Sequence, residues 1–293
     1  MTAPMRDQVV LITGASSGIG KETALGLARL GAKVILVCRD RDRGTAAAAE
    51  IGRKAPGAAG ISLRVADLSS QAAVRALAAE VLATTPLLHV LINNAGAILP
   101  ERTLSPDGIE MQFAVNHLAP FLLTNLLLPR LLASAPARII TVASQVERKG
   151  TIDFDDLQGA RRYVPLTAYA QSKLANVLFT YELARRLAGT GVTANCLHPG
   201  VIGTRLLADY MGRSRVTGWV SNLAFPGPEK GAKPSIRLAS DPALAAVTGK
   251  YFHELREAES SPASYDRTVA RRLWEVSAAM TGLPPDGAGT GGA

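Results

Sequence analysis

The regular alternation of short apolar runs with longer segments of helical periodicity is the feature that most constrains the fold of this 293-residue chain. Runs rich in Val, Ile and Leu with the length of strands occupy 9–13, 34–38, 62–65, 90–92, 138–142 and 193–197. Apolar residues recur at helical spacing in 19–30, 43–53, 71–83, 109–132, 168–188, 228–239 and 265–280. Such alternation predicts βαβ units, and hence an α/β fold with a doubly wound parallel sheet and helices on both faces.

The composition fits one globular domain. Hydrophobic residues make up 47% of the chain and charged residues 19%, which is typical of a packed protein. We expect the domain to span 1–282, and we expect 283–293, where proline and glycine dominate, to be disordered. The apolar side chains of 205–225 favour a lid within 205–240 that closes over an apolar substrate. The same side chains would equally suit packing on the sheet or on another subunit.

The charge and the cysteines exclude several classes of protein. The formal net charge is +8, but basic residues alternate with acids in stretches such as 39–43, and no nucleic-acid-binding motif accompanies them. We therefore expect no nucleic-acid partner. Cys38 and Cys196 both lie in strand-like runs, which indicates buried thiols rather than a disulfide framework. The four histidines show no metal-ligand spacing, so we predict no metal site.

We expect no membrane span and a cytoplasmic location. Few residues precede the first strand, which leaves no room for a secretory or anchoring segment. The most apolar later stretch, 118–128, contains Pro120 and is too short to cross a bilayer. The surrounding helix, 109–132, is apolar nearly all round, so it is buried either within the fold or at a subunit interface. A homodimer or homotetramer is compatible with the second arrangement.

A glycine-rich turn, TGASSGIG at 13–20, joins the first strand to the first helix. Glycines at 14, 18 and 20 permit a tight turn and close backbone approach, and a helix N-terminus offers free N–H groups and the positive end of its dipole to a pyrophosphate. A turn that merely connects strand and helix is the alternative. The strand before it and the helix after it favour dinucleotide binding.

The residues at the end of the second predicted strand indicate whether the chain binds NAD or NADP. An acidic residue at this place would bind the ribose hydroxyl of NAD, but Arg39 comes first and can pair with a 2′-phosphate. Alternatively, Arg39 forms a surface ion pair with Asp40 or Asp42, and Asp40 is the ribose ligand. We predict NADP(H), with NAD less favoured.

Tyr169 and Lys173 are candidates for proton chemistry. They lie four residues apart on a predicted helix, so both side chains project from one face. A phenol normally titrates near pH ~10, and a neighbouring cation stabilises its ionised form. A helical Tyr and Lys alone would more often be a surface pair. Here the run 93–96 (NNAG), Asn116 and Ser144 accompany them, at or near the carboxyl ends of strands where parallel sheets build sites.

These motifs together resemble the short-chain dehydrogenase/reductase family, which has a Rossmann-type fold, up to about Tyr251. In chain order the motifs are TGASSGIG, NNAG, Asn116, Ser144, YAQSK and the turn 198–200 (HPG). The stretches 153–157, 168–200 and 261–266 are more narrowly similar to the retinol dehydrogenase branch. Membrane-bound members of that branch carry an N-terminal anchor, and this chain begins directly at its first strand, so we do not expect a membrane-resident retinoid enzyme.

The resemblance implies a role for each matching residue. Tyr169 would be the acid in reduction and the base in oxidation, and Lys173 would hold the nicotinamide ribose and lower the pKa of Tyr169. Ser144 would orient the carbonyl, and Asn116 would hold a water that relays protons. The implied cofactor contacts are Gly14, Ser16, Ser17, Gly18, Ile19 and Gly20 at the phosphates; Arg39; Asp67 and Leu68 at the adenine; Asn93, Ala95 and Gly96 along the adenosine side; and Pro199, Gly200, Ile202 and Thr204 at the nicotinamide amide. The substrate pocket would include Gln145, Val146, Tyr163, Leu206, Tyr210 and Trp219.

The implied reaction is hydride transfer between NADP(H) and a small-molecule carbonyl or alcohol, with a hydrophobic, retinal-like substrate expected. Since cells generally keep NADP reduced, carbonyl reduction is the favoured direction. A carbon–carbon double-bond reductase related to protochlorophyllide reductase is an alternative on the same fold. A non-catalytic NADPH-binding sensor is an alternative of another class.

Overall fold

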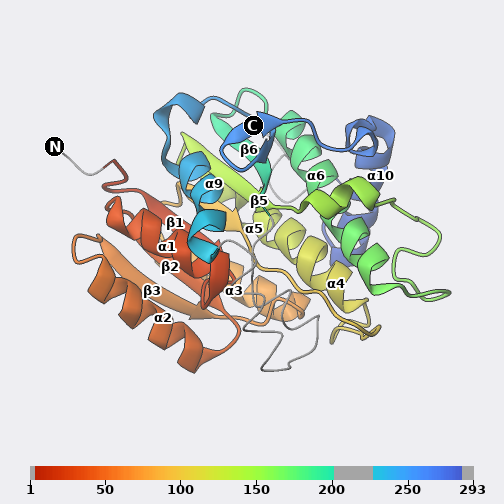
Figure 1. Cartoon of the computed structure of the whole chain (residues 1–293), viewed down its shortest axis with the longest axis horizontal. Coiled ribbons are helices and arrows are strands. Elements are labelled where there is room, and N and C mark those ends of the chain that lie inside the picture. The colour runs from red at the N-terminus through yellow and green to blue at the C-terminus, as the bar shows by residue number, and fades with distance from the viewer. Residues whose placement is uncertain (1–3, 201–226, 286–293) are drawn as a thin grey trace.

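In the computed structural model, which describes residues 4–200 and 227–285, one sheet of eight strands runs through the molecule (Figure 1). The strands are β1 (Val9–Thr13), β2 (Lys33–Cys38), β3 (Gly60–Val65), β4 (Val90–Asn93), β5 (Ala137–Val142), β6 (Val192–His198), β7 (Tyr251–His253) and β8 (Arg256–Ala258). Their order is β3-β2-β1-β4-β5-β6-β7-β8. Pairing is parallel from β3 to β7, and β8 pairs antiparallel with β7. The predicted doubly wound parallel sheet is confirmed.

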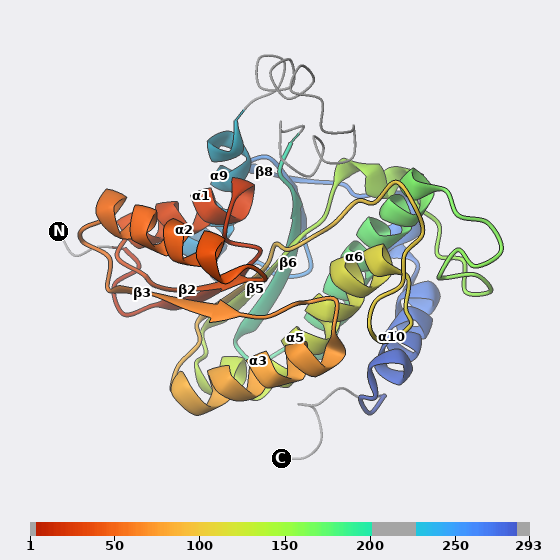
Figure 2. The ribbon, with the colours of Figure 1, turned by 90° about the horizontal axis from the view of Figure 1, so that it is seen from below.

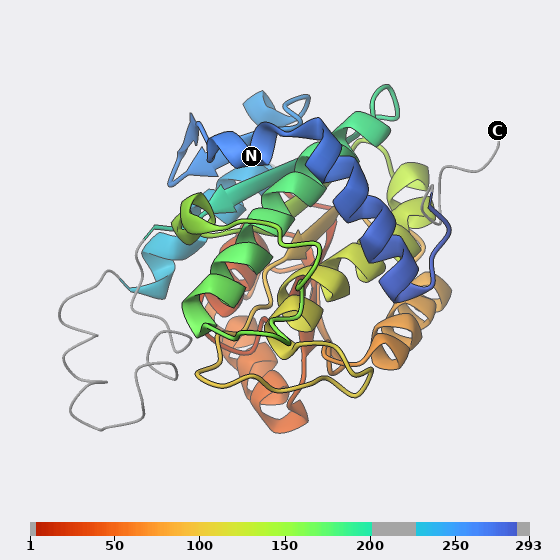
Figure 3. The ribbon, with the colours of Figure 1, turned by 90° about the vertical axis from the view of Figure 1, so that its right-hand side faces the viewer.

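Helices cover both faces of this sheet (Figure 2). They are α1 (Gly18–Arg29), α2 (Arg41–Lys54), α3 (Gln71–Thr84), α4 (Met111–Phe113), α5 (Ala119–Ala133), α6 (Pro165–Arg186), α9 (Pro228–Ser240) and α10 (Arg267–Thr281). Figure 2 shows α1, α2 and α9 on one side of the sheet and α3 and α5 on the other. α10 lies against α6 (Figure 3).

Alternation along β1 explains the two layers. Successive side chains of a strand point to opposite faces, and Leu11 packs in a cluster with Leu77 of α3 and Leu122 of α5. Its neighbours Val10 and Ile12 belong to the cluster on the other face. Because both faces are covered, the central strands β1, β2 and β4 are apolar nearly throughout, which is why their positions could be predicted from composition.

Two elements correct the sequence analysis. β7 and β8 were missed because three residues are too few for a periodic signal, although Tyr251 and Phe252 are buried. Residues 228–240, which the predicted lid included, form α9, whose Leu238 is buried in the core against the sheet. The helix expected at 228–239 is therefore present, and the lid at 205–240 stays a prediction. Residues 205–226 of the predicted lid lie outside the described residues, and so do residues 286–293 of the predicted disordered tail. Leu283, the first residue of that tail, packs on the core, and its N–H donates to Ala278 O.

The predicted helix over 109–132 is continuous from Met111 to Ala133, but it is not uniformly α-helical. Residues Ala114–Leu118 form a π-helical turn, in which Ala119 N donates to Ala114 O. Pro120 explains the wider turn, because its ring nitrogen has no hydrogen to donate to the carbonyl oxygen of Asn116, four residues earlier.

The described residues contain one helix that is long and apolar enough to cross a membrane, and it is this 23-residue helix, Met111–Ala133. The expectation that the apolar stretch 118–128 is too short to cross a bilayer therefore does not hold for the whole helix. Within its most apolar window, however, 83% is buried inside the fold, against α3, α6 and α10. A core helix shows this burial, and the covering elements belong to the same chain. The cytoplasmic location and the oligomeric state stay predictions.

Candidate active site

In the glycine-rich turn between β1 and α1, backbone segments approach one another too closely for side chains at Gly14 and Gly20. Gly14 adopts φ +69°, and a Cβ there would lie 2.9 Å from the Cα of Ala95. A Cβ on Gly20 would clash with the carbonyl oxygen of Gly14. Gly18, at φ +57°, faces no atom of the described residues within 4 Å, and the side chain of the N-cap Ser17 makes no capping hydrogen bond to α1. The first-turn N–H groups of α1 can therefore meet a phosphate that approaches over Gly18.

Thr13 and Asn94 brace this turn, and sequence reasoning gave neither of them that role. Thr13 Oγ1 accepts hydrogen bonds from the N–H groups of Asn94 and Ala95, each at 3.0 Å. The Asn94 side chain donates to Thr13 O at 2.8 Å. Their only sequence signal is their place beside the glycine turn and the NNAG run, because the contacts span about eighty positions of the chain.

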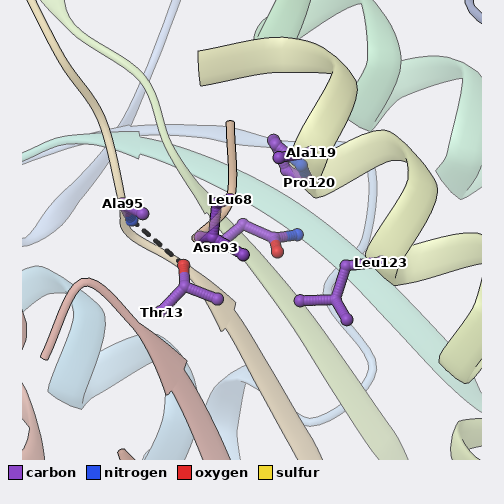
Figure 4. A pocket seen from close by; sticks show the side chains of 7 residues that line it. All are labelled: Thr13, Leu68, Asn93, Ala95, Ala119, Pro120 and Leu123. Atoms are coloured by element: carbon purple, nitrogen blue, oxygen red, sulfur yellow. Dashed lines mark hydrogen bonds between the residues drawn. The ribbon is translucent and has the colours of Figure 1, made fainter. Parts of the chain in front are cut away.

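A pocket opens beside these residues at the carboxyl ends of β1 and β4 (Figure 4). Three predicted cofactor residues, Leu68, Asn93 and Ala95, line it together with Thr13. Asn93 is fixed in place, since its Nδ2 donates to Thr124 Oγ1 at 2.9 Å. Asp67 lies next to the pocket in a turn, where one of its carboxylate oxygens accepts from Ser69 N at 3.0 Å.

The corner between α1 and α2 carries positive charge. Arg39 is exposed directly after β2, and no ion pair joins it to Asp40 or Asp42. Asp40 is the N-cap of α2, where its Oδ1 accepts from Arg43 N at 2.9 Å. The guanidinium of Arg43 donates to Ser17 Oγ at 3.3 Å. Arg43 was missed by sequence reasoning; its signal was its place in the first turn of the second helix, four residues after Arg39.

Ser144 and Tyr169 meet at the end of β5. Ser144 caps the 3₁₀ turn Gln145–Lys149, accepting from Val146 N at 3.4 Å. Burial raises the pKa of Tyr169 to about 12, and the interaction of the phenol with the Ser144 hydroxyl opposes that rise. The net shift in the protein alone is upward, and the lowering of this pKa by Lys173 stays a prediction.

Lys173 lies one helical turn from Tyr169 and is only 3% exposed. Its Nζ lies 5.6 Å from the centre of the Tyr169 ring and donates to Val142 O at 3.0 Å. Burial lowers the pKa of Lys173 to about 8. The predicted juxtaposition of phenol and amine is present, with the amine held by β5.

Asn116 sits in the π-helical turn, fully buried. Its amide exchanges hydrogen bonds with the backbone of Ala97, accepting at 2.6 Å and donating at 2.9 Å, and it also donates to Ser172 Oγ at 3.0 Å. Ser172 in turn donates to Tyr169 O at 2.8 Å. A Cβ on Gly96 would lie 3.3 Å from Asn116 Oδ1 and 3.4 Å from Lys173 Nζ. Gly96 thus joins the cofactor pocket to the candidate catalytic residues.

The structure does not bring the predicted substrate residues together with Ser144 and Tyr169 as a group. Gln145 is exposed and Val146 half-buried in the turn after Ser144. Tyr163 is held elsewhere by two polar groups, accepting from Gln112 Nε2 at 2.6 Å and donating to Glu110 Oε1 at 3.2 Å. Pro199 and Gly200 follow β6 at the same sheet edge. The remaining predicted residues, Ile202, Thr204, Leu206, Tyr210 and Trp219, lie outside the described residues.

Comparisons with known proteins agree with this geometry. The profile of the short chain dehydrogenase family matches residues 8–212. Human retinol dehydrogenase 14 is 46% identical over 299 residues, an alignment that covers 95% of this chain and 88% of that protein. A crystal structure from Mycobacterium paratuberculosis superposes with a TM-score of 0.76 at 35% identity, covering 95% of this chain and 94% of the other. A short chain dehydrogenase from Escherichia coli CFT073, complexed with NADPH, gives a TM-score of 0.69 at 26% identity, covering 87% and 100% of the two chains.

Proposed function

The chain belongs to the short-chain dehydrogenase family and is an oxidoreductase acting on CH–OH groups, and we propose that it uses NADP(H) on a hydrophobic, retinal-like carbonyl compound or its alcohol. The observation that carries the proposal is the cluster of Ser144, Tyr169 and Lys173 at the end of β5, beside a glycine turn open to a phosphate.

Each side chain has a task in the reduction. Ser144 donates a hydrogen bond to the carbonyl oxygen of the substrate and orients it. The Tyr169 phenol gives its proton to that oxygen as negative charge develops there. The Lys173 ammonium, one helical turn away, stabilises the resulting phenolate until the phenol is reprotonated. Asn116, fixed between Ala97 and Ser172, holds the helix in the geometry from which a water can resupply the proton.

The dinucleotide fits the residues present. Its phosphates would lie over Gly18 at the N-terminus of α1, and its adenosine side would lie along Leu68, Asn93 and Ala95. When bound, NADPH supplies the hydride that the carbonyl carbon receives.

The charged corner supports NADP over NAD. Arg39 and Arg43 both belong to the edge where a 2′-phosphate of the adenosine ribose would lie, and Arg43 already reaches Ser17. Asp40, the alternative ribose ligand, commits one carboxylate oxygen to capping α2.

The substrate class rests on the relatives and on the apolar segment 205–225. Retinol dehydrogenase 14 is named for a long apolar alcohol, and a similar pocket would favour long aldehydes over short ones. Since cells generally keep NADP reduced, we propose carbonyl reduction as the working direction.

The test follows NADPH and NADH oxidation by the purified protein against aldehydes and ketones of increasing length, retinal included. We expect turnover with NADPH that rises with apolar length and is lost in Tyr169→Phe, which keeps the ring and removes the proton. Product analysis must show the alcohol. A saturated carbon–carbon bond beside an intact carbonyl would instead identify a double-bond reductase, and tight NADPH binding without turnover would favour a sensor.

A further inference from the structure

Glu147 is a fully buried carboxylate that the proposed chemistry does not use. It lies in the turn that follows Ser144, and its N–H donates to Ser144 O at 3.0 Å. Its own carbonyl accepts from Gly150 N at 2.9 Å, which closes the turn. The position of Glu147 is therefore coupled through the backbone to that of Ser144.

The partner of this carboxylate comes from the C-terminal part of the chain. Ser261 donates to Glu147 twice, from its backbone N at 2.9 Å and from its Oγ at 2.5 Å. Ser261 is 3% exposed and opens the 261–266 stretch that the sequence analysis singled out. Hydrogen bonds to a buried charge are short and strong, and losing one leaves the charge undersolvated.

Further hydrogen bonds hold Ser261 itself. Ser264 Oγ donates to Ser261 O at 2.6 Å and shares a hydrogen bond with Ser260 Oγ at the same distance. Ser260 Oγ is hydrogen-bonded to the hydroxyl of Tyr181 on α6 at 2.7 Å. The C-terminal stretch is thus anchored to the helix that carries Tyr169.

The turn after Ser144 is wedged between that stretch and α6. A Cβ on Gly150 would lie 2.6 Å from Ala170 O, in the residue after Tyr169. The turn therefore touches the first part of α6 at Gly150 and is hydrogen-bonded to Ser261 at Glu147.

We propose that the segment Ser260–Asp266 is a positioning element for the reaction: through Ser261 it holds Glu147, and so sets the place of the Ser144 hydroxyl relative to the Tyr169 phenol. Ser261 and Glu147 are positioning residues, since neither touches the reacting atoms. This inference rests on the proposed function and deepens it.

The test compares two buried serines, one inside the segment and one outside it. Ser261→Ala removes the side-chain donor to Glu147, whereas Ser134→Ala removes a buried hydroxyl that accepts from Leu88 N at 2.9 Å, outside the Ser260–Asp266 segment and the site. In Ser261→Ala we expect kcat/KM for the carbonyl to fall about tenfold, as for a small misplacement of a catalytic group. The Kd for NADPH should stay unchanged. The primary isotope effect on kcat/KM with 4-deuterated NADPH should rise, because hydride transfer becomes more rate-limiting.

Ser134→Ala should keep the wild-type isotope effect and kcat/KM, and Ser261→Thr, which restores a hydroxyl, should recover most of the lost rate. If Ser261→Ala does not fold, Ser261→Cys keeps the volume and a weaker donor, and should show the same pattern with smaller amplitude. Equal behaviour of the Ser261 and Ser134 variants, or parallel loss of NADPH affinity and rate, overturns the inference. Absence of carbonyl turnover in the wild type overturns the proposed function instead.

Discussion

Lys173 Nζ lies 5.6 Å from the centre of the Tyr169 ring and donates a hydrogen bond to the carbonyl oxygen of Val142 at 3.0 Å. The amine is thus both part of the site and buried against β5. Burial lowers its pKa from 10.5 to about 8, so between these values the unfolded chain binds more protons at this residue than the folded protein does.

Stability from Lys173 therefore rises with pH through this window and is lost as pH falls through about 8. We expect Lys173→Met, which cannot be protonated, to be most stable relative to the wild type near neutral pH. That difference should shrink steadily toward about pH 10. Denaturant midpoints of both proteins across this range measure it, and a difference that does not vary with pH contradicts the prediction.

Substitutions in the glycine turn should separate a loss of stability from a loss of cofactor affinity. Gly20→Ala places a Cβ against Gly14 O and should destabilise the fold, as overpacking does, by roughly 1–3 kcal/mol. Gly18→Ala meets no atom within 4 Å among residues 4–200 and 227–285, so it should cost only the strain of φ +57°, yet its methyl group occupies the phosphate approach. Its main effect should be a weaker affinity for NADPH.

Gly52→Ala, in the exposed part of α2, provides the matched control for both glycines. It meets no neighbour and should stabilise the helix by about 0.5–1 kcal/mol. Thermal melts and NADPH titrations of the three variants separate the effects. Wild-type NADPH affinity in Gly18→Ala would show that the phosphates lie elsewhere.

Arg43 should distinguish NADP from NAD. Its guanidinium already reaches the glycine turn through Ser17, and a charge-assisted hydrogen bond to a phosphate contributes about 1.5–3 kcal/mol. Arg43→Ala should therefore raise the Kd for NADPH by roughly tenfold or more and leave the Kd for NADH nearly unchanged. Arg41→Ala, in the same helical turn, is the control. Equal losses for both dinucleotides would argue against contact with the 2′-phosphate.

The features that could be predicted from the sequence involve residues that are close together in the chain. Tyr169 and Lys173 are four residues apart on one helix, so their proximity follows from helical geometry. The positions of β1, β2 and β4 followed from buried apolar runs. The link between Glu147 and Ser261 spans 114 positions and carries no spacing signal, and the Thr13–Asn94 brace spans 81. The sign of the Tyr169 pKa shift also required the structure, because burial raises this pKa more than the Ser144 hydroxyl lowers it.

Pro120 should matter to catalysis more than to stability. Its missing N–H leaves Asn116 O without an α-helical donor and accompanies the π-helical turn that sets the Asn116 amide between Ala97 and Ser172. Pro120→Ala supplies that donor and should let the turn tighten toward an α-helix. We expect kcat to fall about tenfold while the thermal midpoint is unchanged or higher.

Pro129→Ala is the matched control, because Pro129 interrupts the same helix about 13 Å further along its axis, away from the site. It gains a comparable helical hydrogen bond and should raise stability without changing kcat. Comparing kcat and melting temperature for the two variants separates a loss specific to the π-helical turn from a general effect of removing proline. If kcat in Pro120→Ala equals that of the wild type, the turn is not what places Asn116.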